Sequence, residues 1–204
     1  MTVVINGSTG ITTPSPVVLE GSTSGTLTLA GPAVAGTNTQ TLVAVTGTLA
    51  PVVSGTAVNV SGTSVNFTDI PPWVKRITVM LNVVSTTSIG IPCIQIGSGS
   101  VDTSGYTSAI TQSTSSTGST VLSATNSIVL NALGNASYTL TGQVVLTLVG
   151  SNIWVASVCL GGSGNFATVG GGAKTLSGVL DRVRLTTTTG IDTFDAGTIN
   201  IIYE

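Results

Sequence analysis

Apolar and polar residues follow one another in short alternating runs along most of the chain. The segment Thr26-Leu27-Thr28-Leu29 alternates with a period of two, which is the pattern of a strand with one buried face. A longer run over Val74–Val84 continues this alternation and predicts a long strand. Its apolar face is expected to carry Ile77, Val79, Leu81 and Val83, and its polar face Arg76, Thr78, Met80 and Asn82.

Runs of this kind predict strands over the whole sequence. In the first part they cover Thr2–Ile5, Val17–Leu19, Thr26–Ala30, Thr41–Val45 and Ala57–Val60. Further along they cover Val74–Val84, Ile91–Ile96, Tyr106–Thr111, Ser127–Leu130, Tyr138–Val149, Ile153–Leu160, Arg182–Thr188 and Thr198–Tyr203. Gly150-Ser151-Asn152, between two long apolar runs, predicts a hairpin turn. Apolar residues do not recur at helical spacing with caps over a useful length, so the chain is predicted to be all-β.

The character of the sequence changes near residues 60–68. Before that point the predicted strands are short, their corners are rich in Gly, Ser and Thr, and Glu20 is the one charged residue. Asp69-Ile70-Pro71-Pro72-Trp73 then forms a rigid turn, because consecutive prolines fix φ and exclude helix before them. We therefore predict a short-stranded N-terminal attachment region over 1–66 and an antiparallel β-sandwich or jelly-roll-like domain over 67–204.

Composition narrows the classes of function. Charged residues make up 6% of the 204 residues and His is absent, while 36 Thr, 24 Ser and 26 Gly are present. Without imidazole, His-based catalysis, His-ligated metal sites and His pH switches are excluded. A net charge of −2 leaves no basic patch for nucleic acid, and no apolar run is long enough for a spanning helix. We expect no nucleic-acid partner and no membrane partner.

The low charge also bears on assembly and compartment. So few charges protect an isolated monomer poorly against association, so apolar surface is expected to be buried between copies. The N-terminal Met-Thr-Val-Val-Ile-Asn-Gly has no basic n-region and is not a secretory signal, which predicts folding in the cytoplasm where the chain is made. In that compartment Cys93 and Cys159 are expected to be buried free thiols, with a disulfide as the less favoured alternative.

Groups suited to catalysis are sparse. A Ser nucleophile would need a base, and only Lys75 and Lys174 are available, with no Ser-x-x-Lys pattern. The glycine runs at 161–165 and 170–174 lack the Gly-Lys-Ser/Thr sequence and the following helix of a phosphate loop. These two runs are expected to be flexible or tightly turned loops. No catalytic residue and no enzyme activity are predicted.

Four aspartates are candidates for a calcium site or a glycosidase pair: Asp102, Asp181, Asp192 and Asp195. Their spacing matches no calcium loop, and nothing singles out an acid and a base. Salt bridges are the favoured role, and the available partners are Lys75, Arg76, Arg182 and Arg184. Charged residues gather over 69–76 and 174–204, so these two regions are expected to be neighbours in space. No metal site and no cofactor are predicted.

Aromatic side chains offer one candidate for binding. Trp154, in an apolar strand, is expected in the core or at an interface. Tyr106 follows the loop-like Asp102-Thr103-Ser104-Gly105 and is expected to be the most exposed aromatic. A ring in that position beside Asp102 could stack on a sugar, so Tyr106 and Asp102 are possible glycan contacts. A Tyr that starts a strand and anchors it is the equally favoured alternative.

A family resemblance adds to this picture. Phe67–Met80, which contains Trp73-Val74-Lys75-Arg76-Ile77-Thr78, resembles a module of bacteriophage and prophage tail-fibre or other virion appendage proteins. The segments Ile94–Gly99 and Val101–Tyr106 continue the resemblance, and Asp192–Glu204 is similar to the way such modules close. The N-terminal Val4–Ile11 and Ala30–Thr39 are also similar to phage fibre sequences.

The resemblance implies a homotrimeric virion protein. Its N-terminal part would attach to other virion proteins, and its distal β domain would adhere to host-surface polysaccharide. It also implies assembly in the host bacterial cytoplasm, and it carries over no catalytic residue. A capsid decoration or head-fibre protein is the alternative function, and a glycan depolymerase is the less favoured one, since such enzymes need a carboxylate pair in a groove.

Overall fold

The computed structural model describes residues 17–20, 26–29, 51–116 and 118–204. The chain divides into two compact units, Met1–Thr48 and Leu49–Glu204. In the first unit, β1 (Val17–Glu20) pairs antiparallel with β2 (Thr26–Leu29), in agreement with two of the predicted strands. The strands predicted at Thr2–Ile5 and Thr41–Val45 lie outside the described residues. The described residues contain strands and no helix, so the all-β prediction is confirmed for them.

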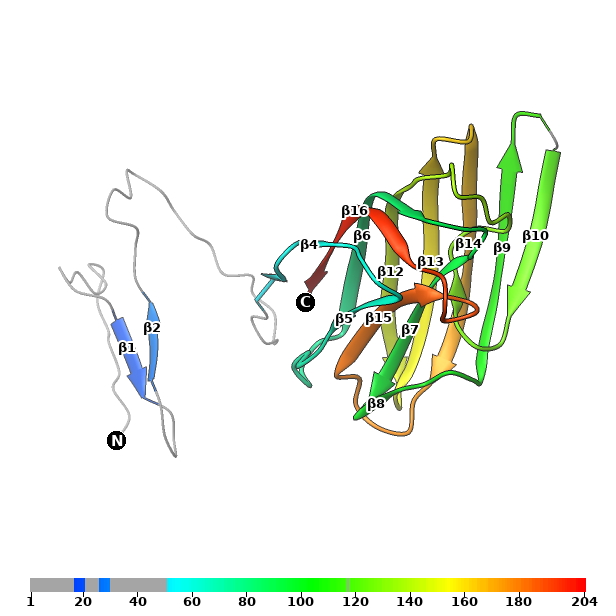
Figure 1. Cartoon of the computed structure of the whole chain (residues 1–204). Helices are drawn as coiled ribbons and strands as arrows, with labels where there is room; N and C mark the ends of the chain where they lie inside the picture. Colours follow the sequence, from blue (N-terminus) through cyan, green and yellow to red (C-terminus); the bar gives the residue numbers. More distant parts are fainter. Residues whose placement is uncertain (1–16, 21–25, 30–50, 117) are drawn as a thin grey trace, which may run out of the picture. The chain divides into compact units, whose positions relative to one another are not determined.

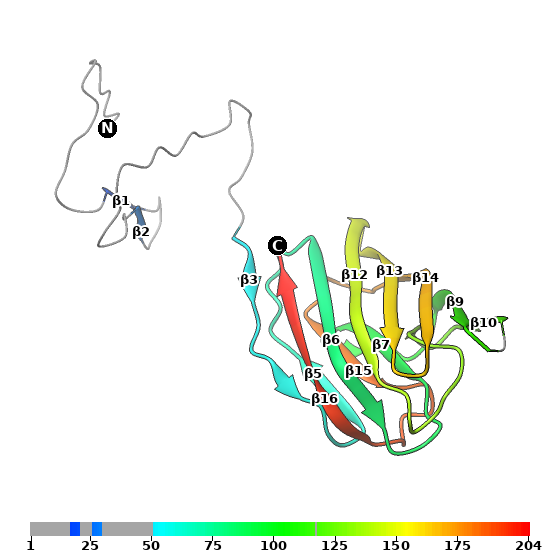
Figure 2. The same cartoon turned by 90° about the horizontal axis from the view of Figure 1, so that it is seen from above.

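The second unit is an antiparallel β-sandwich of two sheets (Figures 1 and 2). The larger sheet has nine strands in the order β10-β9-β14-β13-β12-β6-β16-β3, with β4 also paired to β16. Their bounds are β3 (Val53–Ser54), β4 (Val58–Asn59), β6 (Arg76–Thr86), β9 (Tyr106–Thr114), β10 (Gly118–Ala124), β12 (Leu140–Gly150), β13 (Ile153–Gly162), β14 (Phe166–Thr175) and β16 (Phe194–Tyr203). The β-branched Val, Ile and Thr that fill these strands suit a pleated, half-buried surface.

The smaller sheet has five strands in the order β11-β7-β15-β5, with β8 paired to β7. Their bounds are β5 (Ser64–Phe67), β7 (Pro92–Ser98), β8 (Ser100–Val101), β11 (Ile128–Val129) and β15 (Arg182–Thr187). The core lies between the two sheets. From the larger sheet it takes Ile77, Val79, Leu146 and Trp154, and from the smaller one Ile94, Ile96, Val183 and Leu185, all of them buried. The expected core position of Trp154 is therefore confirmed.

The alternation predicted for the long strand is correct as far as Leu81 and wrong at Val83. Ile77, Val79 and Leu81 are buried, whereas Val83 is 45% exposed and Val84 is buried in its place. The register with β12 shifts between Leu140 and Gly142, so a bulge turns the following residues to the other face. Val83 occupies the left-handed region at φ 54°, which is unusual for a β-branched residue.

The predicted hairpin after β12 is confirmed. Gly150 pairs with Ile153, which leaves Ser151 and Asn152 as a two-residue turn. Both residues have positive φ, at 48° and 60°, as a type I′ turn requires.

The sandwich unit begins earlier in the chain than the predicted boundary between residues 66 and 67. The strands β3 and β4 pair with β16, and β5 pairs with β15. Val60 and Val65 are buried in the same core as the later strands. In the sequence, short strands and low charge group this segment with the N-terminal region, but neither property determines which strand it pairs with.

The second glycine run is a strand, and its prediction as a loop is wrong. Gly170, Gly171 and Gly172 lie within β14, between β13 and β9. A Cβ at Gly172 would lie 2.5 Å from the carbonyl oxygen of Thr107 and 2.6 Å from Cδ1 of Ile128. Glycine is typical of turns, but here it allows neighbouring backbone and side chains to approach closely within a sheet.

The two charged regions are neighbours, as predicted. Arg76 Nη1 lies 3.0 Å from Glu204 Oε1, and the backbone N–H of Ile70 donates to the carbonyl of Asp181. Trp73 also packs on Tyr203, with 5.8 Å between ring centroids. These contacts fasten the turn before β6 to the end of the chain.

Candidate functional site

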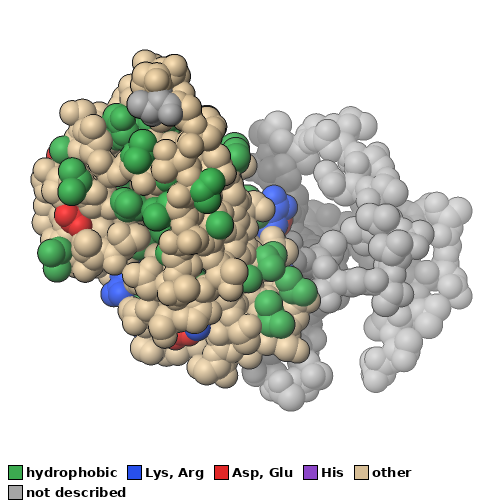
Figure 3. Space-filling model, turned by 90° about the vertical axis from the view of Figure 1, so that its right-hand side faces the viewer, with side chains coloured by type: hydrophobic (Ala, Val, Ile, Leu, Met, Phe, Trp, Pro, Cys, Tyr) green, Lys and Arg blue, Asp and Glu red, His purple; other side chains and the backbone are tan. Residues whose placement is uncertain are grey.

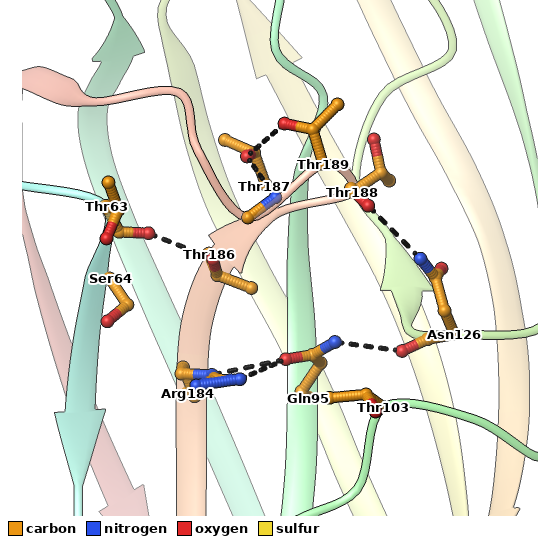
Figure 4. Close-up of a pocket in the computed structure, with 11 residues that line it drawn as sticks. Thr63, Ser64, Gln95, Thr103, Asn126, Arg184, Thr186, Thr187, Thr188 and Thr189 are labelled. Carbon is orange, nitrogen blue, oxygen red and sulfur yellow. Dashed lines mark hydrogen bonds between the residues drawn. The ribbon is translucent and has the colours of Figure 1, made fainter.

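A polar pocket of about 230 Å³ opens on the smaller sheet (Figure 4). Its floor and walls come from β5, β7 and β15, from the loop after β8, from the residues before β11 and from the loop after β15. It is lined by Thr63, Ser64, Gln95, Thr103, Asn126, Arg184, Thr186, Thr187, Thr188, Thr189 and Gly190. Nearly every lining side chain therefore offers a hydroxyl, an amide or a guanidinium.

Strand register explains why Arg184 and Gln95 face this pocket together. Arg184 is paired with Gln95 on β7 and with Asn66 on β5. Its neighbours Val183 and Leu185 are buried in the core, so alternation turns Arg184 to the outer face of the sheet. Arg182, two residues earlier on the same strand, is partly exposed as well, in keeping with the alternation of Arg182-Val183-Arg184-Leu185 in the sequence.

A chain of hydrogen bonds fixes the pocket floor. Arg184 donates from Nε and Nη2 to Oε1 of Gln95, at 3.2 and 2.9 Å. Gln95 in turn donates from Nε2 to the carbonyl of Asn126 at 3.0 Å, and Asn126 donates from Nδ2 to the carbonyl of Thr188. Because Gln95 is 5% exposed and both ends of its amide are bonded, it holds the guanidinium in one orientation.

The threonine-rich loop above the floor is tied to Asp192. The hydroxyls of Thr187 and Thr189 donate to Asp192 Oδ2, and Ser88 donates to Oδ1. These hydrogen bonds, first from Ser88 and then from Thr189, hold the pKa of Asp192 below its usual value. The loop that forms the upper wall in Figure 4 is thus held by hydrogen bonds to a carboxylate.

A second pocket of about 370 Å³ adjoins the first. The two share Asn126 and Thr188, whose hydrogen bond lies between them. The second pocket is less polar, since Ile91, Leu122 and Val129 contribute to its lining. A polar cavity and a partly apolar one therefore lie side by side.

The predicted glycan contacts, Tyr106 and Asp102, are not part of this pocket. Tyr106 is 3% exposed, so the expectation of an exposed ring is wrong. Its hydroxyl accepts from the N–H of Ile96 and lies 3.0 Å from the carbonyl oxygens of Ile96 and Asp102. Burial raises the pKa of this phenol well above its usual value. Tyr106 begins β9 and anchors the loop before it, which is the alternative role considered for it.

Asp102 is engaged in an ion pair. Its Oδ2 lies 2.7 Å from Nζ of Lys174, and that ammonium also lies 5.4 Å from the centre of the Tyr106 ring. This arrangement stabilises the start of β9 and leaves neither side chain free for a sugar.

The other predicted acidic partnerships are correct in part. Asp181 forms an ion pair with Arg182 at 2.7 Å, and that guanidinium lowers the pKa of Asp181. Asp192 and Asp195, by contrast, accept from hydroxyls, Asp195 from Ser85. Within the described residues, no cluster of three Cys, Asp or Glu side chains is placed to hold a metal ion.

Both cysteines are free thiols, as expected, but they differ in burial. Cys93 is buried in β7, and burial raises its pKa to about 11, against smaller opposing effects of a Ser127 hydrogen bond and Arg184. Cys159 is exposed on β13, so its predicted burial is wrong.

Among the described residues, no helix is long and apolar enough to cross a membrane.

Most pocket residues were not identified from the sequence. Alternation around Arg184 was the one usable signal, because it showed that this side chain faces outward. Thr63, Thr103 and Asn126 come from distant segments, and only the pairing of β5, β7 and β15 brings them together. In a chain with 36 Thr, no single hydroxyl stands out.

Comparison with known proteins adds no relative to this description. No family model, no curated protein and no solved structure matches the chain.

Proposed function

We propose that this chain is a structural subunit of a bacteriophage virion appendage, whose sandwich domain binds host-surface glycans through the pocket on the smaller sheet. The proposal rests on the polar pocket, together with the resemblance of Phe67–Met80 and Asp192–Glu204 to virion appendage modules. In it the protein is not an enzyme, needs no cofactor and acts by adhesion.

The lining of the pocket supports sugar binding. Hydroxyls and amides both donate and accept hydrogen bonds, which is what the many hydroxyls of a sugar ring require. The cavity of about 230 Å³ is smaller than the roughly 300–1,000 Å³ of sites for drug-sized ligands, so it suits one sugar unit. The neighbouring, less polar pocket offers room for the next unit of a chain.

The outer face of the larger sheet supports self-association, and we propose a homotrimer. In the four strands β9, β14, β13 and β12 the one charged residue is Lys174, whose register partners Trp154 and Tyr106 are buried. The outward positions are therefore free of charge. Val169 on β14 and Val121 on β10, which are both in register with Thr111 of β9, are each more than half exposed. Figure 3 shows the side where β9 and β10 lie, with scattered hydrophobic side chains and few charged ones.

A second copy of this chain is the occupant that this face suits best. An uncharged face that packs against uncharged surface of further copies leaves no charge buried without a partner. The first unit, Met1–Thr48, has Glu20 as its one charged residue and would in the same way pack against other virion proteins.

Binding to intact bacteria tests the adhesive function. Fluorescently labelled full-length protein is added to a panel of strains before and after periodate treatment, which cleaves sugar diols. We expect binding to at least one strain that falls after treatment and falls equally with Thr103→Trp, which places a large ring at the pocket wall. Binding that survives both changes would exclude the pocket as a glycan site.

Imaging the assembled particle separates the proposed location from its alternative. Gold-labelled antibody against the sandwich domain is expected to mark tail appendages in electron micrographs. Label over the capsid would replace the proposal with a head-fibre or decoration role, and absence of label from purified particles would overturn the virion assignment itself.

A further inference from the structure

Arg184 is the feature of the pocket that indicates the charge of its ligand. Three of the five Lys and Arg residues form ion pairs with carboxylates, namely Arg76, Lys174 and Arg182. Within the part of the chain that the structure describes, Arg184 is in no such pair, although it is half-buried at the pocket floor. A guanidinium that is partly removed from water and lacks a carboxylate is favourably paired with an anion from outside.

The hydrogen bonds already formed by Arg184 define how an anion would approach. A guanidinium has five N–H groups, and the Nε and one Nη2 donor go to Gln95 Oε1, so 5 − 2 = 3 donors remain. These lie on Nη1 and Nη2, at the far end of the planar group. A carboxylate can meet that end with two parallel hydrogen bonds, which is the strong bidentate geometry of arginine and carboxylate.

Asp192 is the acidic side chain linked to the pocket wall, and its oxygens are occupied. It accepts from Ser88 and from the hydroxyls of Thr187 and Thr189. The oxygens of those two hydroxyls in turn accept from the backbone N–H groups of Gly190 and Ile191. Other hydroxyls of the lining, such as those of Thr103 and Thr188, can bond to sugar hydroxyls while Arg184 takes the charged group.

We propose that the pocket recognises an acidic sugar, a hexuronic acid or a related carboxylated unit of a host polysaccharide. Arg184 binds the carboxylate end-on, and hydroxyls of the lining, among them Thr103 and Thr188, bond to the ring hydroxyls. This inference rests on the proposed glycan-binding function and narrows it to one class of sugar. The adjoining pocket, with Leu122 and Val129 in its lining, receives the next unit of the chain.

Titration of the full-length protein with matched oligosaccharides tests the charge requirement. The probes are a tetrasaccharide that contains glucuronic acid, a glucose tetrasaccharide, and inorganic phosphate, with binding followed by calorimetry or by NMR of the ligand. We expect the acidic tetrasaccharide to bind at least about tenfold more tightly than the neutral one, because a charge-assisted hydrogen bond is worth that much. Phosphate, which lacks a ring, is expected to bind weakly.

Variants on the same strand isolate the role of Arg184. Arg184→Gln is expected to remove the preference for the acidic sugar, and Arg184→Lys to restore only part of it, because a point charge cannot form the fork. Arg182→Gln is the matched control. It lies two residues away on β15, pairs with Asp181 and does not line the pocket, so binding is expected to be unchanged. Melting temperatures establish that each variant is folded.

Thr103→Trp keeps the test decisive if Arg184→Gln proves unstable, because Thr103 is an exposed loop residue. It is expected to abolish binding of the acidic sugar in a folded protein. Equal affinity for acidic and neutral sugars overturns the acidic specificity and leaves glycan binding intact. Tight binding of phosphate with neither sugar bound overturns both proposals in favour of a simple anion site. Binding of neither sugar nor phosphate also overturns both.

Discussion

Backbone strain in this fold is concentrated at single residues, and Val83 is the clearest case. A bulge opposite Leu140 and Gly142 turns it outward and places its backbone in the left-handed region. Across the sheet, Gly197 has φ 100°, and a Cβ there would lie 2.4 Å from the carbonyl oxygen of Val83. The two strands β6 and β16 therefore bend together at this point, and the bend depends on one glycine and one strained valine.

Replacing the strained valine is expected to stabilise the protein. The left-handed conformation of a β-branched residue costs roughly 1–3 kcal/mol, and Val83→Gly removes this cost. In return, the greater backbone freedom of glycine in the unfolded chain costs about 0.5–1 kcal/mol on folding. We expect the free energy of unfolding in urea to rise by about 1 kcal/mol. Val155→Gly, at an exposed strand position outside the positive-φ residues, is the control and is expected to lower it. Equal losses in both variants would show that Val83 is unstrained.

Asp192 should make part of the stability depend on pH. Its folded pKa lies below that of an unfolded Asp, about 3.9, because three hydroxyls donate to the ionised carboxylate. The stabilisation is therefore present above that value and is lost as pH falls through the folded pKa. Asp192→Ala is expected to lower the free energy of unfolding by about 1 kcal/mol at pH 7 and by much less near pH 2. A gap that is equal at both pH values would contradict this account.

The pairing of strands determines which residues lie side by side in the sheets. The sequence predicts only some of these strands and pairings. Alternation located β6, β13 and β15, since each has one face in the core. It could not locate β10 or β14, because Ser, Thr and Gly fill positions where the pattern needs apolar side chains. The pocket depends on β5 joining β15, a pairing across more than a hundred residues that no local pattern encodes.

Glycine in β14 is expected to be required for packing. At Gly172 a methyl group would meet the Thr107 carbonyl and Ile128, which are within 2.6 Å of its position. Gly172→Ala is therefore expected to cost about 2 kcal/mol, as overpacking of a core does. Gly161→Ala is the control, because the nearest atom to its Cβ is 3.7 Å away, and it should change stability by less than about 0.5 kcal/mol. Chemical denaturation of both variants measures the difference, and similar small effects would refute the packing argument.

At the scale of the whole molecule, the sandwich unit carries its own core, and its extent can be tested. The unit begins at Leu49, and the segment before β6 contributes the buried Val60 and Val65. Removal of that segment also uncovers the edges of both sheets at β16 and β15. Stability should therefore depend on where the chain is cut.

Two fragments distinguish the boundaries. A fragment over 49–204 is expected to melt cooperatively and close to the melting temperature of the full chain. One over 67–204 is expected to melt about 10 °C lower or to aggregate, since two buried valines and three paired strands are lost. Equal melting temperatures by circular dichroism would show that β3–β5 add nothing to the domain.

A charge placed on the outer face of the larger sheet tests whether the chain assembles through that face. Val169→Lys places a charge in the middle of that face, on a strand position that is 57% exposed in one copy. We expect light scattering to show the full-length protein as a trimer and the variant as a monomer, since burying an unpaired charge is costly. Val179→Lys, in the loop between β14 and β15, should leave the trimer intact. A monomeric full-length protein would contradict the assembly at once.

The order of the strands that follow the N-terminal unit along the chain has a mechanical consequence. A chain held at its N-terminal end and pulled through a bound ligand would be loaded first at β3 and β4, each joined to β16 by only two residue pairs. The hydrogen bonds of such short pairings would break one after another. The released residues would lengthen the segment between the two units before the later strands of the core separate. The next strand in line is β5, and the pocket wall residue Ser64 lies on it. Tension on β5 would then reach the proposed glycan pocket, because the strand that bears the load also forms part of the pocket wall.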